Sequence, residues 1–249
     1  MHAHAHVEST EDLSNPVIQD WNAYTAADHE VWQILYAKRM RELESTASDV
    51  FLRGAEIIGL SPEHIPNLAE VNRRLRRRTG WSAVPVDGFL PAREFFASLA
   101  ERRFPTTVTI RAKESVDYVP EPDIFHDVFG HVPLHSDPAF AGFLQKCGKV
   151  AARASTDEEV EMMTRLFWFT VEFGLVREGG KAKIYGSGLI SSAGDAANAL
   201  GPGCDRRPFS VKAVISQSFR IDELQPILFV VESFDQLFEA IDDIAERIG

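Results

Sequence analysis

The stretch PDIFHDVFGHVPLH, residues 122–135, carries two histidines five positions apart, His126 and His131. Metal-binding histidines on one face of an α-helix usually stand four apart, because residues i and i+4 point the same way. Five residues of regular helix leave the second side chain about 140° away from the first. Gly130 and Pro133 interrupt the apolar helical pattern, so we expect a helix end that lets His131 swing back toward His126. On this pattern alone, a metal site and two unrelated histidines both remain open.

A carboxylate in an apolar helix strengthens the metal hypothesis. Glu172 lies inside the segment RLFWFTVEFGLV. An ionised carboxylate in such surroundings needs a cationic partner, because its desolvation is costly. Arg165, about two helical turns earlier, is one candidate, and a metal held by His126 and His131 is the other. Two imidazoles and one carboxylate form the facial triad of mononuclear iron oxygenases, which leaves the remaining coordination positions open.

Composition and charge narrow the class of protein. The chain has 249 residues, 45% hydrophobic and 25% charged, which predicts one large globular domain or at most two. Its net charge of -11 argues against nucleic acid as the main partner, and the basic run at 72–80 is expected to be a solvated helix face. No apolar run is long enough to span a membrane, and the N-terminus lacks the apolar core of a signal peptide. Cys147 and Cys204 allow no disulfide framework, so we expect a cytoplasmic protein.

Helical periodicity dominates the chain and predicts a mostly α domain with small β-ribbons. Apolar residues recur at three- and four-residue steps over 28–43. Helix starts are expected at Ser61-Pro62, at Asp137-Pro138, at Thr156 ahead of a long helix over 157–176, and at Ser233 ahead of a last helix ending near residue 248. Short strands are expected near 108–111, 183–186 and 227–232.

At these residues the sequence resembles the pterin-dependent aromatic amino acid hydroxylase family, and within it the bacterial phenylalanine 4-hydroxylases. The matching segments, in family order, are YVPEPDIFHDVFGHVPLHSDPAF, FWFTVEFGL and KIYGSGLISSAGD, with looser similarity over 24–234. The resemblance implies that family's catalytic-domain fold. Residues 21–249 would form one catalytic domain without a regulatory domain or tetramerisation tail, and hence a monomer. We expect residues 1–20 to be a disordered tail.

The resemblance also implies the cofactors and their contacts. His126, His131 and Glu172 would be the ligands of Fe(II), with no other catalytic residue. The second cofactor would be a tetrahydropterin. Its implied contacts are Phe95, which stacks on it, Gly88, Leu90 and Ala92, which line its site through backbone atoms, and Asp127, which faces it through water.

A third set of residues would bind the substrate. Arg111, oriented by Asp123, would bind the substrate carboxylate, since a guanidinium fork matches a carboxylate in shape and charge. The other implied contacts are Pro122 and Trp168 at the substrate ring, and Gly188 and Ser191 at the substrate end. Ser191 would also hydrogen-bond the ligand His126 from behind.

The implied activity is the conversion of L-phenylalanine to L-tyrosine with O2, with small molecules as the only partners and no nucleic acid or membrane. Trp168 matches the phenylalanine enzymes but Ile221 matches the tryptophan enzymes, so a tryptophan hydroxylase is the alternative within the family. A zinc hydrolase using the same three ligands would need a polar base near the open position. A non-catalytic module with a structural metal would need a fourth protein ligand, for which His135 is the only near candidate.

Each single position also has a purely structural explanation. Phe95 and Trp168 could pack in the core, Arg111 could pair with a surface acid, and Ser191 could cap a helix. Their joint occurrence with the three candidate ligands favours the functional interpretation. The chain also departs from the mammalian members of the family: Phe167 stands where they have a tyrosine near the pterin, and Pro105 where they have a histidine. These departures predict a less polar pterin site.

Overall fold

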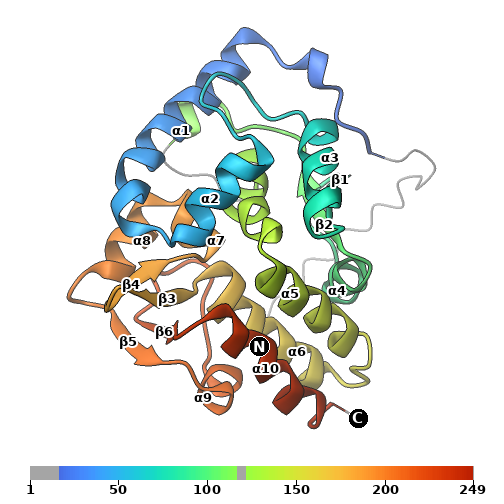
Figure 1. Cartoon of the computed structure of the whole chain (residues 1–249), viewed down its shortest axis with the longest axis vertical. Coiled ribbons are helices and arrows are strands. Elements are labelled where there is room, and N and C mark those ends of the chain that lie inside the picture. The colour runs from blue at the N-terminus through green and yellow to red at the C-terminus, as the bar shows by residue number, and fades with distance from the viewer. Residues whose placement is uncertain (1–16, 117–121, 249) are drawn as a thin grey trace, which may run out of the picture.

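The computed structural model describes residues 17–116 and 122–248 (Figure 1). Its α-helices are α1 (Ala26–Thr46), α2 (Asp49–Ile58), α3 (Leu68–Arg78), α4 (Ala92–Ala100), α5 (Pro138–Ala151), α6 (Asp157–Phe167), α7 (Ser187–Ser191), α8 (Ala193–Leu200), α9 (Val211–Ser216) and α10 (Phe234–Ala245). Its strands are β1 (Ser82–Val86), β2 (Arg103–Thr107), β3 (Leu175–Glu178), β4 (Lys181–Ile184), β5 (Asp205–Pro208) and β6 (Ile227–Val231). Short 3-10 helices are η1 (Trp21–Ala23), η2 (Lys113–Ser115) and η4 (Val132–Ser136), and η3 (Phe125–His131) and η5 (Trp168–Glu172) are π-helices.

The strands form two small sheets, so the predicted fold class, mostly α with little β, is confirmed. β1 and β2 pair in parallel. The second sheet has the order β4-β3-β6-β5, in which only the β3–β4 pair is antiparallel. Helices make up most of the rest of the described chain; β1 and β2 lie beside α3, and the second sheet lies below α7 and α8 in the view of Figure 1.

Side-chain caps begin several of the helices at the predicted places. Thr156 and Glu159 form a reciprocal capping box at the start of α6. Asp137 caps α5, with Pro138 in the first turn where no N–H is missed, and Ser233 caps α10. The helix start predicted at Ser61-Pro62 is wrong. Ser61 O instead accepts a hydrogen bond of 2.9 Å from Trp32 Nε1, and the chain there forms bends.

Several predicted elements have different bounds in the structure, among them the strand expected near 183–186, which is β4 at Lys181–Ile184. The long helix expected over 157–176 continues as α6 only to Phe167, passes into η5, and is replaced by β3 from Leu175. Gly174 stands between η5 and β3, where no larger residue fits, because a Cβ there would lie 2.2 Å from both Thr170 O and the Tyr185 ring. The strand expected at 108–111 lies earlier, as β2. The backbone after β2 bonds to the segment before η3 instead, where Ile124 donates to Thr109 O at 2.8 Å.

The π-helix η3 lies in the middle of the hydrophobic core. Its Phe125 and Phe129 rings stack at 4.5 Å, and both side chains are fully buried. Trp32 of α1 and Phe51 of α2 meet Phe129 edge-on. α5 follows η4 and packs against α4 on one side and α10 on the other (Figure 1). The chain carrying the two histidines is therefore held by packing on most sides.

Residues 1–20 were predicted to be a disordered tail, and residues 1–16 of it lie outside the described part of the chain. Beyond that point, Gln19 donates to Pro66 O at 3.0 Å and accepts from Leu68 N at 2.8 Å. The basic run forms α3, with its arginines exposed to solvent as predicted. In the part of the chain that the structure describes, no helix has the length and apolar character needed to cross a membrane.

Candidate metal centre and active site

The π-helix η3 accounts for the five-residue spacing of the histidines. Backbone hydrogen bonds in a π-helix run from residue i to i+5, so residues five apart lie over one another. His126 and His131 both belong to η3, and their Nε2 atoms lie 3.3 Å apart. The predicted helix end at Gly130 is therefore wrong, since the chain stays helical through His131 and continues as η4. Gly130 instead allows close packing against α7: a Cβ there would lie only 3.0 Å from Ser187 O.

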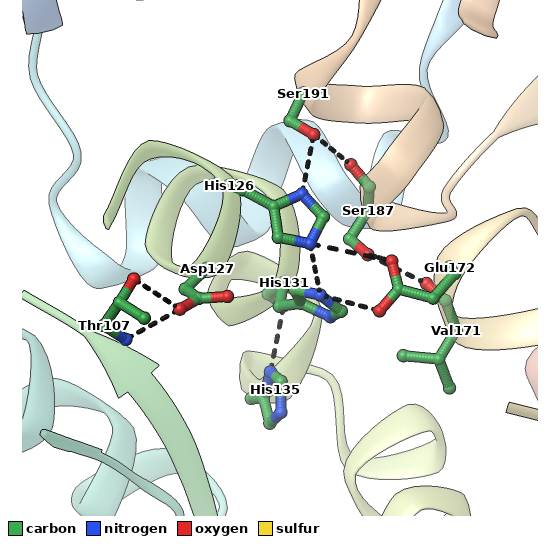
Figure 2. Close-up of polar contacts among 9 residues, drawn as sticks. All are labelled: Thr107, His126, Asp127, His131, His135, Val171, Glu172, Ser187 and Ser191. Carbon is green, nitrogen blue, oxygen red and sulfur yellow. Dashed lines mark hydrogen bonds and ion pairs between the residues drawn. The ribbon is translucent and has the colours of Figure 1, made fainter. Parts of the chain in front are cut away.

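Glu172, the last residue of η5, completes the cluster (Figure 2). Its Oε1 lies 3.2 Å from His131 Nε2 and its Oε2 lies 3.7 Å from His126 Nε2. The three residues offer ligand atoms that all lie within 4.8 Å of one another. Arg165, the alternative partner for Glu172, instead pairs with Glu161 and donates to Ile215 O at 3.0 Å.

A hydrogen-bond chain fixes the tautomer of His126. Ser191 Oγ donates to Ser187 O at 2.8 Å, so its single proton is used there. His126 Nδ1, at 2.9 Å from the same oxygen, must then carry the proton and donate it to Ser191. The lone pair of Nε2 is left facing the cluster. The predicted hydrogen bond between Ser191 and His126 is thus present, and it prepares His126 as a ligand.

These side chains fit a divalent cation. The lone pair of His126 Nε2 faces the Glu172 carboxylate, and two such groups repel unless a cation or a proton lies between them. Octahedral bonds of about 2.1 Å place adjacent ligand atoms about 3 Å apart, close to the separations of 3.2 and 3.3 Å observed here. Burial alone would raise the pKa of Glu172, but His131, His126 and the Ser187 hydroxyl lower it to about 2. The carboxylate is therefore ionised at neutral pH.

The cluster is open on one side. Among the described residues it contains three candidate ligands and no fourth. His135 lies beyond His131, where its Nδ1 contacts His131 O at 2.9 Å and its ring packs against Trp81 and Phe104. A closed structural site would need a fourth protein ligand, so the arrangement disfavours a purely structural metal.

A cavity of about 860 Å³ lies in front of the open side, a size ordinary for a small-molecule site. Its walls contain the three candidate ligands and nearly all of the predicted pterin and substrate residues: Gly88, Leu90, Ala92, Phe95, Asp127, Arg111, Pro122, Trp168, Gly188 and Ser191. Asp123 does not line the cavity. It lies behind Arg111 and holds it.

Comparison with known proteins agrees with this geometry. Residues 15–249 match the family described as biopterin-dependent aromatic amino acid hydroxylase. The chain belongs to this family.

Its relatives include bacterial and animal hydroxylases. Phenylalanine-4-hydroxylase of Ralstonia nicotianae is 42% identical over 223 residues, covering 89% of this chain and 71% of the relative. Tyrosine 3-monooxygenase of Rattus norvegicus is 38% identical over 229 residues, covering 90% of this chain but 46% of the relative. The crystal structure of Chromobacterium violaceum phenylalanine hydroxylase with iron (III) and oxidized cofactor 7,8-dihydrobiopterin has a TM-score of 0.89 at 37% identity, covering 93% of this chain and 85% of that one. The predicted family and fold are confirmed.

In this hydroxylase Arg111 is preorganised by Asp123. Arg111 donates from Nε to Oδ2 at 2.7 Å and from Nη2 to Oδ1 at 2.8 Å, and both side chains are less than a tenth exposed. Asp123 also accepts a hydrogen bond of 3.0 Å from the backbone N–H of His126, so it contacts the segment that carries this candidate metal ligand. Burial favours the neutral acid, yet the Arg111 guanidinium keeps the pKa of Asp123 below its usual range. The surface pairing considered for Arg111 is therefore wrong.

Asp127, which also lines the hydroxylase cavity, is held by Thr107 (Figure 2). Its Oδ2 accepts from the backbone N–H and from the hydroxyl of Thr107, both at 2.7 Å. Burial raises the pKa of this carboxyl, because the charged form is poorly solvated there. Both donors of Thr107 point at one oxygen, so Oδ1 is left for other contacts.

Aromatic rings form much of the remaining wall. Phe95 is half-buried and meets Phe167 edge-on at 5.1 Å. Trp168 stacks on Phe219 at 4.4 Å and 14°, and its Nε1 donates to Gln225 at 3.3 Å. Ile221 is also in the wall but is 81% exposed, which places it at the rim of the hydroxylase cavity.

Sequence reasoning missed three residues that hold the site. Ser187 donates to Glu172 Oε2, Thr107 holds Asp127, and the buried Arg39 of α1 donates to Leu189 O and Ile190 O of α7. Ser187 could have been suspected, because it stands between two glycines in the segment KIYGSGLISSAGD, on which the resemblance rests. Arg39 and Thr107 stand in ordinary helix and strand patterns, which carry no sign of their contacts.

Proposed function

We propose that this chain converts L-phenylalanine to L-tyrosine, using O2, ferrous iron and a tetrahydropterin. The observation that carries the proposal is an open cluster of two imidazoles and one carboxylate beside a cavity that also presents a buried, preorganised arginine. The bacterial relatives named phenylalanine-4-hydroxylase support this choice of substrate. The Chromobacterium violaceum enzyme with bound iron (III) and 7,8-dihydrobiopterin supports the choice of cofactors.

In this proposal His126, His131 and Glu172 hold the iron. Iron and pterin together supply the oxidising power when bound. The chain's own residues position the reactants and exclude water, and no further side chain needs to act as a general acid or base. Ser191 contributes by holding the proton of His126 on Nδ1, away from the metal.

The substrate carboxylate would bind to Arg111. Asp123 already uses Nε and one N–H of Nη2, so the substrate would meet the outer edge of the guanidinium. Nη1 has only a long contact of 3.5 Å to Val116 O, which leaves it available. The substrate ring would lie against Pro122 and Trp168, and Gly188 and Ser191 would line the end of its site. The candidate iron ligands line the same cavity, so the ring would lie near the metal.

The pterin would occupy the other part of the cavity, stacked on Phe95. Gly88 has φ of 130°, a conformation suited to glycine, and a Cβ there would meet no atom within 4 Å. The backbone at Gly88 is therefore open to close approach, and Leu90 and Ala92 follow it along the wall. Asp127 would face the pterin through the oxygen that Thr107 leaves free.

Two features favour phenylalanine over the other aromatic amino acids. Trp168 is fixed by its stack on Phe219 and its bond to Gln225, so its indole narrows the space available to a second indole. The hydroxyl of tyrosine would enter an apolar wall, where an unsatisfied polar group costs about 1–3 kcal/mol. Ile221, which favoured tryptophan in the sequence, stands at the rim.

The test is a product assay with phenylalanine, tryptophan and tyrosine side by side, with Fe(II), O2 and a tetrahydropterin. We expect tyrosine from phenylalanine at the highest kcat/KM, and no product when iron or pterin is left out. A higher kcat/KM for tryptophan would transfer the assignment to the tryptophan enzymes. Hydrolytic activity with zinc and without pterin would support the zinc hydrolase instead.

We further propose that the hydroxylase acts as a monomer in the cytoplasm. Cys147 and Cys204 are buried free thiols, which suits a reducing compartment. Light scattering of the protein as it elutes from a size-exclusion column should give a mass near 27.8 kDa, and twice that mass would contradict the monomer.

A further inference from the structure

The short helix α7 contacts the three candidate metal ligands from both of its ends (Figure 2). At its start, Ser187 Oγ donates to Glu172 Oε2 at 2.7 Å. At its other end, Ser191 accepts from His126 Nδ1 at 2.9 Å and donates back to Ser187 O at 2.8 Å. A single turn of helix therefore links the candidate carboxylate ligand to a candidate imidazole ligand.

Close backbone packing fixes the Ser187 hydroxyl at the carboxylate. The residues on either side are glycines, and a Cβ at Gly186 would lie 2.4 Å from Glu172 O, while one at Gly188 would lie 3.1 Å from it. Any larger residue would push α7 away from η5. Arg39 holds the far end of α7 through bonds of 3.0 Å to Leu189 O and 2.8 Å to Ile190 O. Ser187 is fully buried, and its hydroxyl has two acceptors within reach, Glu172 Oε2 at 2.7 Å and Val171 O at 3.3 Å, of which the carboxylate oxygen is the nearer and the charged one.

The two carboxylate oxygens of Glu172 are consequently not equivalent. Oε2 accepts the Ser187 hydroxyl, whereas Oε1 lies 3.2 Å from His131 Nε2. Oε2 is still within 3.7 Å of His126 Nε2, so both oxygens lie close enough to the cluster to bind one cation. A carboxylate can bind a metal through one oxygen or through both. A hydrogen bond to Oε2 competes for its lone pairs and favours binding through Oε1.

We propose that Ser187 is a positioning residue that makes Glu172 bind the metal through Oε1 alone. Binding through one oxygen leaves one more coordination position for water, O2 or substrate than binding through both. This inference rests on the proposed metal site. It assigns Ser187 no contact with substrate, and it makes the number of open metal positions depend on one buried hydroxyl.

The experiment uses Mn(II), whose bound water molecules can be counted by the relaxation of water protons. Three protein ligand atoms on a six-coordinate ion leave three positions for water, and a second carboxylate oxygen would take one of them. In Ser187→Ala we therefore expect the relaxation enhancement per bound Mn(II) to fall by about one third. In Ser187→Cys, whose thiol is a weak donor, the relaxation enhancement per bound Mn(II) should lie between the wild-type value and that of Ser187→Ala. Ser136→Ala is the matched control, because Ser136 is equally buried but donates to Pro133 O.

The outcomes separate this inference from the proposed function. If Ser187→Ala binds Mn(II) and its relaxation equals that of the wild type, Ser187 does not select the oxygen and the inference is overturned. The same holds if the variant binds Mn(II) as poorly as Glu172→Gln, because the hydroxyl would then merely keep the side chain in place. If the wild type has no single Mn(II) site, or Glu172→Gln binds as well as it does, the metal site itself fails.

Discussion

His126 and His131 stand five residues apart in the sequence, and their Nε2 atoms lie 3.3 Å apart in the fold. The π-helix η3 creates this relationship, and a second π-helix, η5, ends at Glu172. π-turns are rare and occur frequently at functional sites. Each of the two segments that contribute candidate ligands thus departs from α-helical geometry at the point where a ligand must face the cluster.

Arg111→Lys should raise the KM for phenylalanine about 10- to 100-fold while metal content stays unchanged. Lysine keeps the charge but loses the fork that Asp123 orients, and losing a hydrogen bond to a charged group costs roughly 1.5–3 kcal/mol. Steady-state kinetics and metal analysis of the same preparation check this. An unchanged KM would remove Arg111 from the substrate site.

Thr107→Val should raise the KM for the pterin severalfold and leave the KM for phenylalanine nearly unchanged. The substitution keeps the shape of Thr107 but removes one of the two donors that hold Asp127, worth about 1 kcal/mol. Direct titration of the pterin by calorimetry gives a measurement independent of turnover. Thr107→Ser retains the hydroxyl and should behave like the wild type. Equal pterin affinity in the Val and Ser variants would show that the held carboxylate does not face the pterin.

Trp168→Phe should lower the preference for phenylalanine over tryptophan about 10-fold. The indole stacks on Phe219 and narrows the cavity, and shape alone provides discrimination of this size. The ratio of the two kcat/KM values in wild type and variant measures the effect. A ratio that does not move would place Trp168 outside the substrate pocket.

His135 should make the fold sensitive to mild acid. Burial lowers the pKa of His135 to about 3, so the side chain stays neutral in the folded state while the unfolded chain takes up a proton below about pH 6.5. Stability is therefore constant above that pH and falls as the pH drops toward 3. Between pH 7.5 and 5 the loss is about 2 kcal/mol.

Urea unfolding of the metal-free protein at pH 7.5 and pH 5 measures this loss. His135→Asn keeps a donor for His131 O but does not titrate, so the gap in unfolding free energy between wild type and variant should shrink by about 2 kcal/mol at the lower pH. A gap that is the same at both pH values would mean that His135 is not held neutral.

Local signals predicted the fold where they acted alone. The capping box at Thr156 and the Asp137-Pro138 pair mark helix starts correctly, because caps are satisfied within one turn of chain. Ser61-Pro62 carries a similar signal and fails, because Ser61 O bonds the distant Trp32 indole. The strand predicted at 108–111 failed for the same reason, since that backbone bonds the segment before η3. Long-range contacts overrode the local pattern in both cases.

The site was predictable through resemblance more than through spacing. The sequence motif placed His126, His131 and Glu172 correctly in one cluster. The two histidines are brought together by the π-helix η3, however, and not by the helix end expected at Gly130. A π-helix leaves no clear pattern in the sequence, since it differs from an α-helix by one residue per turn. Ser187 and Thr107 were missed because their partners lie 15 and 20 residues away, and only the fold brings them together.

The measurement that tests the central claim most directly is titration of metal-free protein with Fe(II), with bound iron and tyrosine formation followed together in the presence of phenylalanine and a tetrahydropterin. The account predicts that activity rises in proportion to iron and saturates at one iron per chain. It also predicts that Glu172→Gln, although folded, binds iron weakly and forms almost no tyrosine. A Glu172→Gln variant that binds one iron and hydroxylates phenylalanine normally would contradict the assignment of His126, His131 and Glu172 as the catalytic metal site.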